Sequence, residues 1–269
     1  MNASLSQAAD VLWDCWQQGR RLSSIPDDIR PRTREEGYAV QALLEERSAA
    51  PLFGWKIAAT SAAGQAHINV TGPLAGRLLR EKAFSSGAEL PFGVNHMKVA
   101  EAEFAFRMGR DLPPRQQPYS TGEVLAAVAT LHPAIEVPDS RFDDFTIVGA
   151  PQLIADNACA HQFVLGPAAT TDWRSVDLVE HVVTGTVVGR LFTGRQEQSL
   201  AREGKGANVL GDPRVALAWL ANELSALGIT LKAGQVVTTG TCLVPLPIQP
   251  GDQVTMDFGV LGGLSARMI

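Results

Sequence analysis

Three glutamates have the residue type and the spacing of a metal site. Glu101 and Glu103 lie in the stretch VAEAEFAFRM, and Glu136 follows in HPAIEVPDS. If residues 99–108 form a strand, alternation places Glu101 and Glu103 on one face and apolar residues on the other. Carboxylates crowded among apolar residues repel one another and lose hydration, which oxygen ligation of a hard dication such as Mg2+ or Mn2+ offsets. The pattern favours a divalent metal, and a solvated strand edge is the open alternative.

Lys56 is the second residue whose surroundings suggest chemistry. It lies in LFGWKIAAT, between Trp55 and Ile57. Alternation points its side chain away from both neighbours, which is typical of a lysine on the wet face of a half-buried strand. Beside an acid cluster, the ammonium could instead bind a substrate carboxylate or carry a proton. Desolvation would then lower its pKa and the carboxylates would raise it.

The elements that must position these residues begin with helices. Leu5, Leu12 and Trp16 follow helical spacing, and Thr33 with Glu36 forms a capping box ahead of a second helix that runs toward Arg47. Further helices are predicted after Ser120 with Glu123, and after Asp212 with Pro213 as far as Gly228.

The rest of the chain is predicted to be rich in strands. These strands are 52–59, 99–108, 134–137, 176–183, 186–192, 235–239 and 253–258, separated by Gly, Pro and Asp turns. Strands without regular intervening helices indicate an α+β protein built on a β-sandwich or β-roll. We expect residues 1–50 to form an N-terminal helical segment packed on the core and residues 51–269 to form the catalytic β-roll, together as one compact unit.

Composition and charge exclude several classes of protein. With 45% hydrophobic and 19% charged residues, the chain has ordinary globular usage, which argues against disorder. The net charge is −5 and no basic run occurs, so we expect neither a nucleic acid nor a membrane as partner. No secretory start and no long apolar stretch is visible, which predicts a cytoplasmic protein. The cysteines, which lack a C-x-x-C pair, are predicted to be reduced thiols.

Several segments, in chain order, resemble the fumarylacetoacetate hydrolase superfamily, within it the branch of 2-hydroxypentadienoate (2-keto-4-pentenoate) hydratases and 4-oxalocrotonate decarboxylases. They are GWKIAATS, AEAEFAF, PAIEVPDSRFDD, ADNAC, GKGANVLGDPRVALAWLANEL, QVVTTGT and DFGVLGGLSARM. The resemblance implies a mixed β-roll with an N-terminal helical cap and a homo-oligomer. It also implies that Glu101, Glu103 and Glu136 bind Mg2+ or Mn2+ and that Lys56 lies in the active site as a catalytic group.

The activity that this resemblance implies is that of a lyase in aromatic meta-cleavage catabolism. Such an enzyme adds water to 2-hydroxypenta-2,4-dienoate and gives 4-hydroxy-2-oxopentanoate. Metal ligands alone do not separate this reaction from decarboxylation of 4-oxalocrotonate, which is the alternative. Two further alternatives are a non-catalytic relative that binds 2-oxo acids and a structural protein whose acids are surface charge.

Three positions depart from the pattern of the family. In the loop INVTGPLAGRLL, Thr71 and Leu74 stand where the hydratases usually carry aspartates. Because Leu74 cannot exchange a proton or orient a water, another group must act, a different substrate must be used, or activity has been lost. Cys159, in ADNAC, stands where the branch often has serine. We expect Cys159 to be a small buried thiol in the pocket wall rather than a nucleophile.

Overall fold

The computed structural model of the protein describes residues 3–48, 50–189 and 198–269. The strands are β1 (Gly54–Ala58), β2 (Leu74–Leu78), β3 (Ala83–Ser85), β4 (Ala88–Leu90), β5 (Val99–Met108), β6 (Val128–Val137), β7 (Gln162–Leu165), β8 (Val182–Gly189), β9 (Gln198–Lys205), β10 (Val236–Thr241), β11 (Leu246–Pro247), β12 (Gln253–Asp257) and β13 (Gly263–Met268). The α-helices are α1 (Ala3–Gln18), α2 (Arg34–Glu45), α3 (Ala62–His67), α4 (Thr121–Leu125), α5 (Ala150–Ala155) and α6 (Pro213–Ala226).

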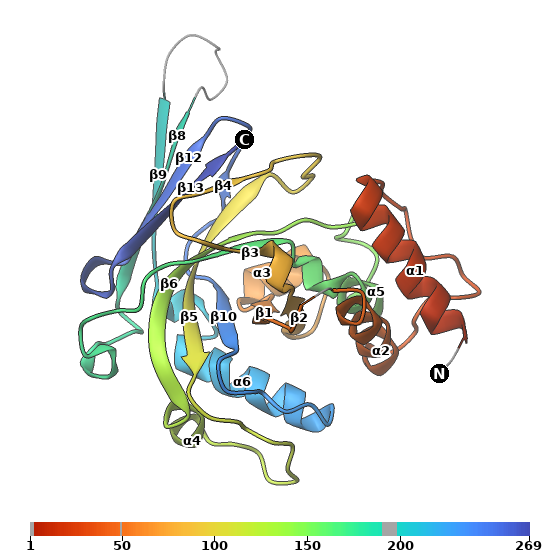
Figure 1. The fold of residues 1–269 in the computed structure, drawn as a ribbon, viewed down its shortest axis with the longest axis horizontal. Coiled ribbons are helices and arrows are strands. Elements are labelled where there is room, and N and C mark those ends of the chain that lie inside the picture. The colour runs from red at the N-terminus through yellow and green to blue at the C-terminus, as the bar shows by residue number, and fades with distance from the viewer. Residues whose placement is uncertain (1–2, 49, 190–197) are drawn as a thin grey trace.

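These strands form two sheets (Figure 1). Among the described residues, the larger sheet has eight strands in the order β2-β1-β10-β5-β6-β7-β3, with β11 paired to β5. The smaller sheet has five strands in the order β4-β13-β12-β8-β9. In Figure 1 the smaller sheet lies on one side of the curved strands β5 and β6, and helices α1, α2 and α5 lie on the other. The prediction of an α+β fold built on a mixed β-roll with N-terminal helices is confirmed.

Strand β5 has the two faces that alternation predicts. Its apolar face packs toward the smaller sheet, where the ring of Phe104 meets that of Phe258, just after β12, edge-on at 5.2 Å. On the same face, the ring of Phe106 meets that of Trp173, in a turn before β8, at 5.8 Å. Apolar burial on this scale is the main favourable term in folding, and it fixes the orientation of the strand. The opposite face of β5 therefore carries the glutamates.

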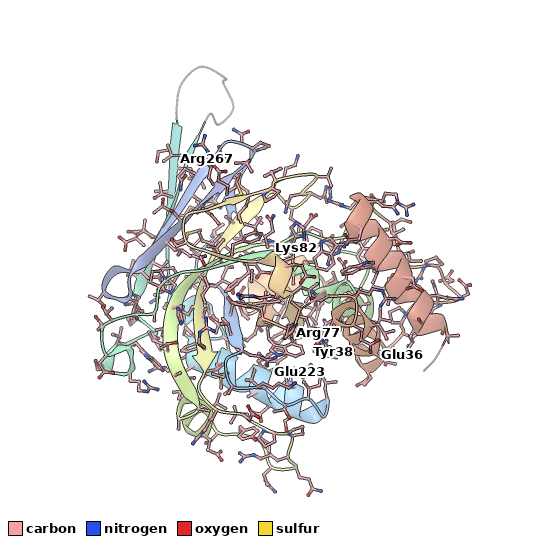
Figure 2. The ribbon with its side chains drawn as sticks, in the orientation of Figure 1. Glu36, Tyr38, Arg77, Lys82, Glu223 and Arg267 are labelled. Carbon is pink, nitrogen blue, oxygen red and sulfur yellow. The ribbon has the colours of Figure 1, made fainter. Side chains whose placement is uncertain are left out.

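The N-terminal helices have a core of their own and polar links to the larger sheet. Ala8, Leu12, Leu43 and Leu44 pack there with Phe142. Two side chains of α2 reach across: Gln41 Nε2 donates to the carbonyls of Ala75 and Ile154 at 2.8 and 2.9 Å. The Tyr38 hydroxyl donates to Glu223 of α6 at 2.8 Å (Figure 2). The helices thus fix β2, although the division of the chain at residue 50 stays a prediction.

Helix ends follow the predicted signals with one difference. Asp212 caps α6, Pro213 is its first residue, and Gly228 follows it in the left-handed region at φ 72°. Thr33 accepts a hydrogen bond from the backbone N–H of Glu36, as expected. The Glu36 carboxylate, however, accepts from the N–H of Arg32 at 2.6 Å. In a capping box this carboxylate would accept from the N–H of the cap residue, Thr33. Here it bonds one residue earlier, at Arg32.

The prediction of separate strands at 176–183 and 186–192 is wrong. The described part of this region is one strand, β8, and residues 190–192 lie outside the described residues. Residues before β8 turn because the Asp177 carboxylate accepts from the N–H of Val179 at 3.0 Å. Gly185 lies inside β8 and does not break it. A side chain does not fit at this position, since a Cβ there would come within 2.6 Å of Leu246. Close packing rather than a turn explains this glycine.

No helix among the described residues is long and apolar enough to cross a membrane. The cysteines are free thiols, as predicted: Cys15, Cys159 and Cys242 are all buried.

Candidate metal centre and active site

The three glutamates converge where β5 and β6 pair antiparallel. Glu101 lies directly opposite Glu136, and Glu103 lies opposite Ala134. One carboxylate oxygen from each glutamate falls within 4.8 Å of the others. Glu103 and Glu136 are fully buried, and Glu101 is half-buried. The predicted grouping of the acids is therefore present.

The hydrogen bonding of these carboxylates is incomplete. Glu103 Oε2 accepts bonds from the hydroxyl of Thr238 and from the N–H of Gly240, the latter at 2.9 Å. Within the part of the chain that the structure describes, Glu103 Oε1 and Glu136 Oε2 have no hydrogen-bond partner. Glu136 Oε1 forms only an ion pair, with Lys56 Nζ at 3.0 Å. Buried acceptors without partners are costly, so the site is short of positive charge.

Electrostatics support the same conclusion. Burial, and then the neighbouring charge of Glu136, raise the pKa of Glu101 to about 7 and raise that of Glu103 well above its ordinary value. Two fully buried carboxylates and one half-buried carboxylate thus face one ammonium group. Oxygen ligands of this kind with free lone pairs suit a hard divalent cation, which would relieve both the repulsion and the missing hydrogen bonds.

Lys56 is buried beside this cluster, with 3% of its surface exposed. The wet-face interpretation of Lys56 is therefore wrong. Its Nζ donates to the carbonyl of Ala158 at 2.9 Å and pairs with Glu136. Burial acts to lower the pKa of Lys56, but the charges of Glu136 and Glu101 outweigh it and raise the pKa above the ordinary value. The lysine is consequently a buried ammonium at neutral pH.

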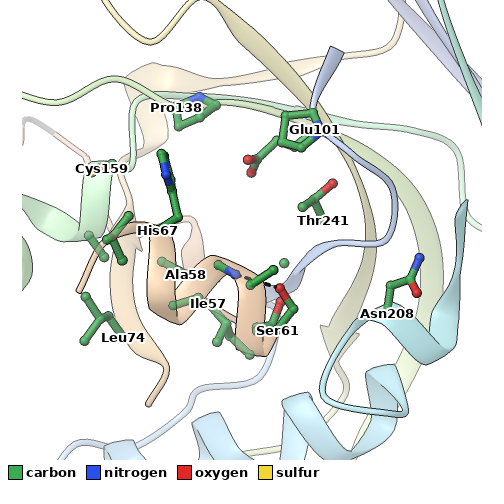
Figure 3. A pocket seen from close by; sticks show the side chains of 18 of the residues that line it. Ile57, Ala58, Ser61, His67, Leu74, Glu101, Pro138, Cys159, Asn208 and Thr241 are labelled. Carbon is green, nitrogen blue, oxygen red and sulfur yellow. Dashed lines mark hydrogen bonds between the residues drawn. The ribbon is translucent and has the colours of Figure 1, made fainter. Parts of the chain in front are cut away.

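A cavity of about 800 Å³ opens beside these residues (Figure 3). Lys56, Leu74, Glu101 and Cys159 line it, whereas Glu103 and Glu136 do not. Figure 3 shows Glu101, Thr241 and Asn208 on one side of the cavity and Leu74 with Cys159 on the other. Most of the remaining wall is apolar and includes Ile57, Ile68, Met97, Phe145, Leu153, Leu210, Leu243 and Val244. Glu101 is thus the acid of the cluster that a ligand in the cavity can reach.

Two of the three departing positions are buried in the cavity wall. Leu74 is fully buried at the start of β2 and Cys159 is 8% exposed, and both line the cavity. Burial raises the pKa of the Cys159 thiol to about 12, so the thiolate is scarce at neutral pH. Thr71 is exposed and lies outside the cavity wall.

Sequence reasoning missed several residues of the site. Thr238 and Gly240 bond to Glu103, and Thr241 lines the cavity. The segment QVVTTGT contained a signal for them, because a glycine inside a strand often marks a bulge or a close approach of a ligand or another backbone. Asn208 and His67 also line the cavity, and no pattern in the sequence distinguished them.

Comparison with known proteins places this arrangement in a family. Residues 45–269 match the fumarylacetoacetate (FAA) hydrolase C-terminal domain. The chain belongs to the fumarylacetoacetate hydrolase family. It is 31% identical over 249 residues to the 2-keto-4-pentenoate hydratase of Paraburkholderia xenovorans, covering 91% of this chain and 88% of the relative. It is 33% identical over 262 residues to the 2-hydroxyhexa-2,4-dienoate hydratase of Comamonas testosteroni, covering 95% and 94%.

A solved structure agrees with this assignment. The 4-oxalocrotonate decarboxylase from Pseudomonas putida G7, complexed with magnesium and adipate, has a TM-score of 0.85 and 27% identity to this chain. The alignment covers 100% of this chain and 98% of the decarboxylase. Hydratase and decarboxylase relatives together confirm the branch of the family that the sequence segments resemble.

Proposed function

We propose that this protein is a metal-dependent hydro-lyase that adds water to 2-hydroxypenta-2,4-dienoate or a close analogue and gives a 4-hydroxy-2-oxo acid. The observation that carries the proposal is the group of buried carboxylates with unpartnered oxygens, which reaches the cavity through Glu101 beside Lys56. The names of the hydratase relatives support the choice of reaction.

In this proposal Glu101, Glu103 and Glu136 hold Mg2+ or Mn2+. A divalent ion at that position would stabilise negative charge on the carboxylate and the 2-oxygen of the substrate. Thr238 and Gly240 orient Glu103 through its second oxygen, so its free oxygen is directed to the cluster.

Lys56 moves the proton in this proposal. Its Nζ carries a proton at neutral pH, and the cavity reaches this buried group. Hydration needs proton transfer to the diene and then addition of water at C4. Because Leu74 has no carboxylate, it cannot share the proton transfer. Lys56 must therefore carry out more of this transfer.

The cavity favours hydration over decarboxylation. Among the described residues that line it, Lys56 is the only lysine or arginine, and Glu136 already pairs with it. 4-Oxalocrotonate carries a carboxylate at each end, and its distal carboxylate would meet an apolar wall without a cation. A substrate with one carboxylate and an apolar or uncharged tail fits this wall better. Decarboxylation stays the second candidate because of the similarity to the decarboxylase structure.

A comparison of two substrates tests the proposal. The protein is incubated with Mg2+ or Mn2+ and freshly generated 2-hydroxypenta-2,4-dienoate, or with 4-oxalocrotonate, and loss of ultraviolet absorbance is followed with product identification. We expect 4-hydroxy-2-oxopentanoate and a higher kcat/KM for the monocarboxylate. Faster conversion of 4-oxalocrotonate would overturn the choice of reaction. Binding of oxalate or pyruvate without turnover of either substrate would identify a non-catalytic binder, which Leu74 would explain.

The proposal also includes a homo-oligomeric, cytoplasmic enzyme. Light scattering on the purified protein tests its oligomeric state. Titration of the metal-free protein with Mg2+ and with Mn2+ tests the choice of ion.

A further inference from the structure

Three consecutive residues beside Lys56 have left-handed backbone. Asn157, Ala158 and Cys159 have φ values of 57°, 50° and 61°. For residues that carry a Cβ this conformation is unfavourable, and it persists only where the surroundings hold it. A run of three such residues, of which Ala158 and Cys159 line the cavity, therefore needs an explanation.

The side-chain amide of Asn157 holds this turn against β2. Its Oδ1 accepts from the N–H of Arg77 at 2.6 Å, and its Nδ2 donates to the Arg77 carbonyl at 2.8 Å. The amide is fully buried, so both bonds form away from water. Gly76 permits the approach of β2, because a Cβ there would lie 2.5 Å from the Asn157 carbonyl oxygen and 3.0 Å from the Lys56 side chain.

The turn presents one carbonyl to the site. The oxygen of Ala158 accepts a hydrogen bond from Lys56 Nζ at 2.9 Å, and the same Nζ lies 3.0 Å from Glu136 Oε1. The ammonium is thus fixed from two directions, by a carboxylate of the acid cluster and by the carbonyl of the left-handed turn. Without the carbonyl, its position would depend on the acids alone.

We propose that Asn157 is a positioning residue for Lys56. By locking the left-handed turn onto Arg77, its amide fixes the Ala158 carbonyl and thereby the lysine ammonium at the wall of the cavity. This inference rests on the proposed function, in which Lys56 moves a proton. Asn157 itself does not line the cavity, so its effect is expected to pass through Lys56.

The chain contains a matched control. Asn222, in α6, makes the same pair of bonds to one residue: its Oδ1 accepts from the N–H of Tyr119 at 2.7 Å, and its Nδ2 donates to the Tyr119 carbonyl at 3.0 Å. Neither Asn222 nor Tyr119 lines the cavity. A substitution at Asn222 therefore measures the general effect of losing such a pair of amide hydrogen bonds. A substitution at Asn157 measures that effect together with any effect on Lys56.

The test compares Asn157→Asp, Asn157→Gly and Asn222→Asp in the metal-dependent hydration of 2-hydroxypenta-2,4-dienoate. Aspartate removes the N–H that bonds to Arg77, and glycine keeps the left-handed backbone without any clamp. We expect kcat to fall about tenfold or more in both Asn157 variants, with KM within about threefold of the wild type, because misplacement of a reacting group costs rate more than binding. The Asn222 variant should keep kcat within about twofold of the wild type.

Wild-type kcat in both Asn157 variants, or an equal loss in Asn222→Asp, would overturn the inference. If Asn157→Asp does not fold, Asn157→Gly decides, because it buries no new charge. If the wild type shows no turnover, the proposed function fails, and a crystal structure of Asn157→Gly then decides the positioning role by itself. Displacement of Lys56 Nζ from the Ala158 carbonyl would support the role, and an unchanged bond would overturn it.

Discussion

Two buried ionic groups lie close together in this protein, and they differ in how completely they are satisfied. In the first, Asp156 pairs with Arg141, and its carboxylate also accepts from the Ser140 hydroxyl at 2.7 Å and from the N–H of Arg141 at 3.1 Å. The Arg141 guanidinium lies 4.5 Å from the centre of the Trp16 ring. Charge and hydrogen bonds balance within this group, so nothing further needs to bind there.

The second group has three carboxylates and one ammonium, with oxygens of Glu103 and Glu136 left without hydrogen bonds in the described residues. Both groups are buried, so burial of charge alone does not identify a functional site. The unbalanced group is the one to which we assign the cation and the substrate in the proposed function. The predictions below test this difference.

The largest effect is expected from Glu103→Gln. The substitution removes the negative charge of one proposed metal ligand. The amide oxygen of glutamine can still accept the hydrogen bonds from Thr238 and Gly240. We expect metal-dependent hydration to be lost, while the metal-free protein unfolds at the same or a higher denaturant concentration because repulsion among the acids decreases. In the wild type, a divalent ion at 100 times its Kd should add about 2.7 kcal/mol to the free energy of unfolding. An equal gain in the variant would contradict the metal site.

The opposite result is expected from Asp156→Asn. Burial raises the pKa of Asp156 even with Arg141 beside it, so the pair is costly to bury and removal of one partner leaves an isolated charge. We expect a loss of about 3–5 kcal/mol in the free energy of unfolding, with metal affinity of the folded protein retained. Denaturant unfolding and metal titration check this. The exposed pair of Glu180 and Lys205 offers a control, since Glu180→Gln should leave stability unchanged. Loss of metal binding in Asp156→Asn would remove the contrast between the groups.

The smallest effect concerns His161, which adjoins the balanced group. Its Nδ1 accepts a hydrogen bond from the Trp16 indole at 3.0 Å, so the ring is neutral. Burial, with the charges of Arg141, Lys82 and Arg21, lowers the pKa of His161 to about 3. The unfolded chain therefore binds the extra proton first, and stability is lost as the pH falls below about 6.5.

When the pH falls from 7 to 5, this histidine should lower the free energy of unfolding by about 1–2 kcal/mol. We expect His161→Gln, which keeps an acceptor for Trp16, to lose less stability over that interval than the wild type. Denaturant unfolding at both pH values measures the difference. The same loss in both proteins would show that His161 does not carry the effect.

Local pattern predicted one half of the site well. Strand β5 has the bounds expected from its alternation, and this alternation places Glu101 and Glu103 on one face. Strand β6 is longer than predicted, because Pro133 and His132 weaken the strand signal although packing on both faces retains them in the sheet. The pairing of Glu101 with Glu136 follows from the register of the two strands, which local sequence does not encode.

The burial of Lys56 could not be predicted from local sequence. Its own segment is typical of an exposed lysine, and its burial comes from residues distant in the chain: β2 on one side, β10 on the other, and the carbonyl of Ala158 above it. The resemblance to a family predicted a functional position for this lysine near the glutamates, whereas alternation predicted an exposed one. Non-local packing overrides a local pattern in this case.

The parallel pairing of β1 with β10 joins Trp55 to Val237 across most of the chain. The same late strand contributes the hydroxyl of Thr238 and the N–H of Gly240 to Glu103. During synthesis, Glu103 must therefore wait for a hydrogen-bond donor, Thr238, that is made 135 residues later. A chain that stops before residue 236 leaves the first strand without its neighbour and Glu103 without its orienting donors. A stable metal centre at these glutamates would therefore require residues 236–241 to be folded against β5.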